Sequence, residues 1–216
     1  MRRLLTCAAV VAATLVVGLL AARVVGALSG LQATALLAAG ECDQPCWQGI
    51  QPGHTTLAEA EAALRVSSVV NVSSPHSDLM LRWASLANPV WRGSAFRMNP
   101  KRTDEAITFV ELKPPQDAFH LGDAITIFGE PVVSTLCWRF DAVPGNVQHP
   151  FLAAHVYFPG NIEVLAYNPL DPRAKRYVPD MAIWSIIYDY PASEPPYRFD
   201  APRWRGFTSA PDDQIC

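Results

Sequence analysis

Five histidines are the first candidates for chemistry in this 216-residue chain, because imidazole can act as an acid, a base or a metal ligand. They are His54, His76, His120, His149 and His155. None belongs to an H-E-x-x-H pattern, which would place two ligands on one helix face. His54 falls in a turn, His120 stands at an expected helix N-cap, and His155 lies in an expected strand. We therefore expect structural or solvent-exposed roles for all five.

Other catalytic patterns are also absent from the sequence. There is no G-x-S-x-G serine nucleophile, phosphate loop or dinucleotide fingerprint. Glu59 and Glu61 are two positions apart on an expected helix and do not face each other, and Asp212 and Asp213 lie in the tail. We expect no catalysis, no cofactor and no metal. An enzyme of unrecognised type is the alternative, with the histidines as its acid–base candidates.

Four cysteines outside the first 40 residues suggest disulfides, because their number is even. They are Cys42, Cys46, Cys137 and Cys216, while Cys7 lies in an apolar segment. Three pairings are open, and we favour Cys42–Cys46 with Cys137–Cys216, which would hold the end of the chain in place. A zinc site needs two close pairs of ligands, and a thioredoxin-type motif needs two residues between its cysteines, so neither fits.

The first 40 residues differ in composition from the rest. Arg2 and Arg3 precede an uncharged apolar run, Leu4 to Ala22, which as a helix nearly matches the hydrocarbon thickness of a bilayer. Positive charge before the run predicts a cytoplasmic N-terminus and an exported remainder. Small residues near 25–27 and 38–40 suit signal peptidase, so both a cleaved signal peptide and a transmembrane anchor stay open. We expect a membrane protein with an extracytoplasmic domain, or a secreted one after cleavage.

The remaining 176 residues carry 14 basic and 20 acidic groups, a net charge of −6. This balance argues against nucleic acid as a partner, which would require a basic face. All 19 prolines lie in this part, which argues against a helical bundle.

Six tryptophans are the other candidates for function. Trp83, Trp138 and Trp184 fall in expected strands and fit cores. Trp47, Trp91 and Trp204 fall in expected loops, where they either cover a small core or form a recognition surface.

Local patterns predict an α+β fold. Thr56 and Glu59 form a capping box that opens a helix ending near Arg65, and a second helix over 121–128 ends at Gly129. Alternating apolar residues predict strands at 79–86, 94–98, 105–113, 132–140, 153–158, 162–167 and 182–190. Pro159-Gly160-Asn161 predicts a hairpin.

The two helices are candidates for a duplication. A shift of 64 positions lays the first helical segment on the second, with two of ten positions identical. We expect an N-terminal signal or transmembrane helix at 1–40, then a helix-plus-strands unit at 41–115 and a helix-plus-antiparallel-meander unit at 116–190. Residues 191–216 are expected to form an irregular tail rich in proline and aromatics.

The segments PCWQGIQPGHTTLAEAEAAL (45–64) and HLGDAITIFGEP (120–131) resemble uncharacterised exported bacterial proteins with a PCWxGIxPGxTT motif. More distantly they resemble the BamE/SmpA-type outer-membrane-assembly lipoproteins and the beta-lactamase-inhibitor-like folds. The motif is split here between the two helices, and Glu41 before Cys42 does not fit a lipidation signal. The resemblance implies a helical pair against an antiparallel sheet and a binding or scaffolding role without catalysis.

Together these patterns predict a non-catalytic binding or scaffolding module of the bacterial cell envelope. Its expected partner is another envelope protein, and it would contact the membrane through the N-terminal helix. The alternative is a secreted inhibitor or a small-ligand-binding protein.

Overall fold

The structure is a computed structural model that describes residue 37 and residues 45–77, 80–86, 92–96, 106–115, 118–139, 150–189, 202–210 and 215. All of these belong to one unit, Leu37–Cys216. No helix within these ranges has the length and apolar character needed to cross a membrane. The predicted apolar helix, Leu4 to Ala22, lies outside the described residues.

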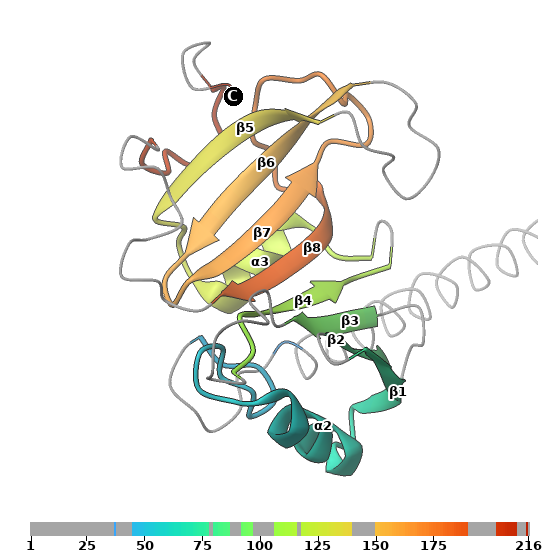
Figure 1. The fold of residues 1–216 in the computed structure, drawn as a ribbon. Helices are drawn as coiled ribbons and strands as arrows, with labels where there is room; N and C mark the ends of the chain where they lie inside the picture. Colours follow the sequence, from blue (N-terminus) through green and yellow to red (C-terminus); the bar gives the residue numbers. More distant parts are fainter. Residues whose placement is uncertain are drawn as a thin grey trace, which may run out of the picture. The chain divides into compact units, whose positions relative to one another are not determined.

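Two helices and one antiparallel sheet form the described fold, as the α+β prediction requires (Figure 1). The elements, in chain order, are α2 (Leu57–Val66), β1 (Val70–Ser77), β2 (Met80–Ser85), β3 (Arg92–Phe96), β4 (Phe109–Lys113), α3 (Leu121–Phe128), β5 (Val133–Arg139), β6 (Phe151–Phe158), β7 (Ile162–Tyr167) and β8 (Ala182–Asp189). The sheet has eight strands in the order β1-β2-β3-β4-β8-β7-β6-β5. Each helix is thus followed by a four-strand meander, and the meanders join through their last strands, β4 and β8.

Both helices begin at predicted signals. Thr56 Oγ1 accepts from the Glu59 backbone N–H at 3.2 Å, and Glu59 Oε2 accepts from the Thr56 N–H at 2.9 Å, which confirms the capping box. At α3 the Asp123 carboxylate accepts from the His120 N–H at 2.9 Å. Gly129 ends α3 with a φ of 84°, a conformation that favours glycine.

The segments before the two helices attach to the sheet in the same way. Thr56 forms an antiparallel bridge with Ala106, just before β4, and His120 forms one with Ala182, the first residue of β8. The matching backbone hydrogen bonds run from Ile107 N–H to the Thr55 carbonyl at 2.8 Å, and from Ile183 N–H to the Phe119 carbonyl at 2.9 Å. The last strand of each meander therefore also anchors the start of its own helix.

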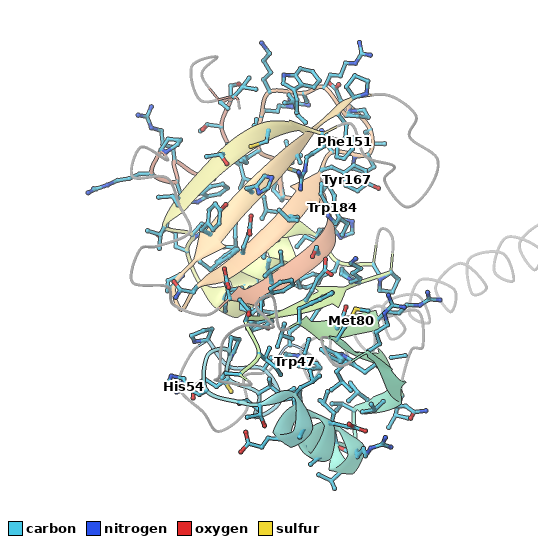
Figure 2. The ribbon with its side chains drawn as sticks, viewed as in Figure 1. Trp47, His54, Met80, Phe151, Tyr167 and Trp184 are labelled. Atoms are coloured by element: carbon cyan, nitrogen blue, oxygen red, sulfur yellow. The ribbon has the colours of Figure 1, made fainter. Side chains whose placement is uncertain are left out.

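An aromatic stack fills the core beside α2. The rings of Trp47 and Trp83 lie 4.8 Å apart at an interplanar angle of 19°, and both are buried. Trp83 pairs in register with Gly93, and the position that a Cβ of Gly93 would occupy is already taken by the Trp83 ring. The Trp83 ring therefore leaves room for no residue larger than glycine at position 93. Figure 2 shows Trp47 inside the fold, near α2 and the first strands.

The predicted helix end near Arg65 is confirmed, since α2 ends at Val66. Two features differ from the sequence expectations. Residues 70–77 form β1, which was not predicted as a separate strand. The described part of the tail, residues 202–210, is not simply irregular, because it lies along the edge of β5. Ser134 N–H donates to the Pro202 carbonyl and Trp204 N–H to the Val132 carbonyl, each at 3.1 Å.

Candidate functional site

The two faces of the sheet have different surroundings, and helix α3 packs against one of them. The Phe128 ring lies 5.5 Å from that of Phe158 in β6 and 6.3 Å from that of Tyr188 in β8. Tyr188 is the cross-strand partner of Val110, Val110 that of Ala95, and Ala95 that of Leu81, and all four residues are buried. Side chains of a strand alternate between faces, so these positions share the side that α3 covers.

Helix α2 covers the same face. It packs against β1 and β2, where Leu81 and Trp83 are buried and the intervening Arg82 is exposed. This confirms the predicted alternation of Leu81 and Trp83 against Met80 and Arg82. The other side, called the open face below, carries no helix in the described part of the chain.

The open face can be followed strand by strand from the register. Its side chains on β2, β3, β4, β8, β7 and β6 are Met80, Arg82, Ala84, Arg92, Ser94, Phe96, Phe109, Glu111, Lys113, Ser185, Ile187, Asp189, Glu163, Leu165, Tyr167, Ala153, His155 and Tyr157.

A half-buried aromatic pair lies on the open face at β3 and β4. The rings of Phe96 and Phe109 are 4.7 Å apart and nearly parallel, at 22°. They are direct cross-strand partners, and Met80 is the partner of Phe96 on the other side. Apolar side chains left partly in water on a flat sheet surface are typical of a contact surface.

Exposed cations surround this aromatic pair. Arg82, Arg92 and Lys113 are exposed on neighbouring strands of the same face. Two half-buried carboxylates lie among them. Glu111 has its Oε2 3.2 Å from Lys113 Nζ and accepts from Ser185 Oγ through Oε1 at 2.9 Å, and Asp189 is the cross-strand partner of Phe109. Three exposed cations against two half-buried carboxylates leave the surface around the pair with an excess of positive charge.

A histidine–carboxylate pair lies on the open face of the second meander. His155 Nδ1 is 2.6 Å from Glu163 Oε1, joining β6 to β7. The other ring nitrogen, His155 Nε2, is buried and has no hydrogen-bond partner in the described structure. A general base must come within about 3 Å of the proton that it removes, and this nitrogen is closed to solvent. The pair thus does not present an accessible base.

One end of the open face is closed by an aromatic cluster. Phe151, Ala153, Tyr167 and Ala182 are buried together, and half-buried Trp184 packs against them. The Trp184 ring lies 5.5 Å from that of Phe151 and 5.7 Å from that of Tyr167. Figure 2 shows these three aromatic residues gathered near one end of the strands. The exposed side chains named above for the open face, Arg82, Arg92 and Lys113, lie instead on the strands around Phe96 and Phe109.

Two of the three tryptophans considered for a recognition surface, Trp47 and Trp204, are described. Trp47 is fully buried in the core stack, so of the two roles left open for it the core role holds and the surface role does not. The indole is large enough to complete a small core against Trp83, and the loop it occupies lies over the sheet. Trp204 is half-buried against Tyr177, at 5.2 Å between ring centroids. Trp91 lies outside the described residues.

Two of the four cysteines predicted to form disulfides are described, Cys46 and Cys137, and two, Cys42 and Cys216, are not. Leu136 forms a parallel bridge with Ile215, and each of these residues directly precedes one cysteine of the favoured pair Cys137–Cys216. The pairing stays a prediction.

No three histidine, cysteine, aspartate or glutamate side chains within the described ranges are grouped so that they could hold a metal ion. Phe96, Phe109 and Lys113 of the open face were not singled out from the sequence. Their signal was the two-residue alternation of their strands, which marks opposite faces but does not say which face stays uncovered.

Comparison with known proteins adds no relative: no family model, no curated protein and no solved structure matches the chain.

Proposed function

We propose that the protein is a non-catalytic binding module of the cell envelope, exported by its N-terminal segment, and that its open face docks an acidic protein surface carrying an apolar side chain. The observation that carries this proposal is the half-buried Phe96–Phe109 pair among the exposed cations Arg82, Arg92 and Lys113. The aromatic pair offers apolar area to a partner, and the cations select one of opposite charge.

The proposed docking surface is small. With strands about 4.8 Å apart and about 3.3 Å per residue, the three strands β2, β3 and β4 that carry it cover roughly 250 Å². A standard protein–protein interface buries about 800 Å² on each partner, so this part of the face would form only the centre of such an interface.

We infer further that the two halves are copies of one unit. The helix starts, Leu57 and Leu121, are 64 positions apart, and both N-caps bridge to the segment that opens the last strand of their own meander. The strand order reverses at the β4–β8 pair, as expected for two copies related by a two-fold axis perpendicular to the sheet. Such an axis keeps both helices on one side, and this leaves the opposite face continuous across both halves.

Site-specific photo-cross-linking in intact source cells tests the docking proposal. A p-benzoylphenylalanine placed at Phe109 should form an adduct with an envelope protein, identified by mass spectrometry. The control position is Val66 on α2, which is 86% exposed on the helix side and should give no such adduct. Arg92→Gln with Lys113→Gln should weaken the adduct, whereas Arg65→Gln should not. No adduct from position 109, or the same adduct from position 66, would contradict the proposal.

The alternative, a secreted inhibitor or small-ligand binder, would use the same face. N-terminal sequencing of the mature protein separates the two, because a retained Leu4–Ala22 segment supports the anchored module. A cleaved product that is free in the medium supports the secreted binder.

A further inference from the structure

A second cationic surface lies away from the open face, on two segments that are hydrogen-bonded together. The β7–β8 connection contributes Arg173, Lys175 and Arg176, and the tail contributes Arg203 and Arg205. These exposed residues are five of the ten lysines and arginines among the described residues. They are unexpected in a chain with a net charge of −3.

Backbone pairing joins the two segments. Tyr177 N–H donates to the Thr208 carbonyl at 3.0 Å, and Ala210 N–H donates to the Lys175 carbonyl at 2.8 Å. Figure 1 shows the red C-terminal segments beside β5, close to the orange connection that follows β7. The cations are therefore carried on connected backbone and not on separate loops.

Aromatic packing holds the part of the tail that carries Arg203 and Arg205. Trp204 lies between Tyr177 and Phe207, with ring centroids 5.2 Å and 5.7 Å away. Arg203 and Arg205 are exposed and flank half-buried Trp204 in the sequence.

Exposed apolar side chains occur on these same segments. Leu170 in the β7–β8 connection is 92% exposed, and Phe207 in the tail is 42% exposed. Val132, which directly precedes β5 and accepts a hydrogen bond from the Trp204 N–H, is exposed as well. Asp171 and Asp180 are the acidic residues of the connection and lie outside the 173–176 run.

We propose that this surface, called the basic platform, rests on an anionic phospholipid bilayer. Its residues are Arg173, Lys175, Arg176, Arg203 and Arg205, with Leu170 and Phe207 as the apolar members. The cations would contact lipid phosphates, and the apolar side chains would enter the interface between headgroups and acyl chains. A soluble polyanion would leave Leu170 and Phe207 in water, which is why a lipid surface is the better fit. The proposal is independent of which partner the open face binds.

Arginine labelling of the full chain in lipid nanodiscs tests the basic platform. Phenylglyoxal modification is followed by mass spectrometry in phosphatidylcholine, with and without phosphatidylglycerol. Each cation near an anionic surface gains about 1 kcal/mol, so labelling of Arg173, Arg176, Arg203 and Arg205 should slow about fivefold in the anionic discs. Arg65 and Arg92 are internal controls and should label at one rate in both. High salt should remove the difference, because it screens exposed charges.

Apolar variants separate a bilayer from a soluble polyanion. Leu170→Ser with Phe207→Ser should reduce the protection in anionic discs, and Val66→Ser on α2, also an exposed apolar position, should not. Equal labelling in both lipids would overturn the proposal. Protection by free polyglutamate as strong as that by anionic discs, with no effect of the two serine substitutions, would overturn the lipid assignment. Neither result bears on the adduct expected from Phe109, so the two proposals fail separately.

Discussion

Replacing Gly93 by alanine should destabilise the fold because Trp83 occupies the space that a Cβ needs. Gly93 has no positive φ, so alanine meets no backbone strain there and the whole effect comes from the ring. The indole cannot move away easily, since it is 97% buried and stacked on Trp47 at 4.8 Å. Overpacking of this kind costs about 1–3 kcal/mol, and the lower entropy of the unfolded alanine chain returns about 0.4–1 kcal/mol. We expect a net loss of roughly 1–2 kcal/mol.

Urea denaturation measures this loss. With a slope of about 2 kcal/mol/M, the midpoint should fall by roughly 0.5–1 M while the slope is unchanged. Ser94→Ala, the next residue on β3 and half-exposed on the open face, is the control and should move the midpoint little. Combining Gly93→Ala with Trp83→Leu should recover most of the alanine penalty, a coupling of about 0.5–3 kcal/mol. An equal penalty in both backgrounds, or no penalty with Trp83 present, would refute the steric argument.

Three further predictions concern the helix cap, two tyrosines and the cysteines. Thr56→Ala should cost about 1 kcal/mol in urea denaturation, because it removes the side-chain acceptor at the start of α2. Hydrogen bonds from Thr56 lower the pKa of Glu59, so the contribution of Glu59 to stability is present above the unfolded pKa and is lost as the pH falls through the folded pKa. Glu59→Gln should therefore reduce the loss of stability on the acidic side of a stability-against-pH curve. An unchanged loss in this variant would contradict the assignment. Burial raises the pKa of Tyr177 and, more strongly, that of Tyr188, so their contribution to stability is complete below the unfolded pKa and is lost as the pH rises. Ultraviolet titration should show that both phenols ionise above the usual range of tyrosine. Replacing Tyr188 with phenylalanine should remove the phenol that ionises last, and a normal ionisation of Tyr188 in the folded protein would count against its burial. Peptide mapping of the unreduced protein should find Cys137 joined to Cys216 and Cys42 joined to Cys46, whereas two or more alkylatable cysteines would rule this out.

Local signals allowed several elements to be predicted correctly from the sequence. The capping box at Thr56 and Glu59, the end of α3 at Gly129 and the hairpin at Gly160 and Asn161 each depend on neighbouring residues. Gly160 and Asn161 both have positive φ, the conformation that their residue types favour. Strand β7 has the predicted bounds because both of its ends are marked by turn residues.

The remaining features depend on pairing between residues far apart in the chain. The alternation of β2 separates Leu81 from Arg82 but cannot say which side a helix will cover. The role of Trp47 stayed open between core and surface because its own neighbourhood predicts a loop, whereas its burial comes from contact with Trp83. The tail runs along β5 because β5 is an edge strand, and no residue near Trp204 in the sequence indicates this.

The β4–β8 pair has a consequence for how such a protein could have arisen. It consists of four register pairs, from Phe109↔Asp189 to Leu112↔Ile186, and it is the contact that makes two meanders into one sheet. A half-length chain would leave this strand as an unpaired edge, ready to bind the same edge of a second molecule. When two copies are fused, the two strands pair within one chain, where their effective concentration is higher than that of two separate molecules. The fused chain is then free to diverge, so that one half can specialise in partner contact around Phe109 while the other keeps its face closed around Trp184.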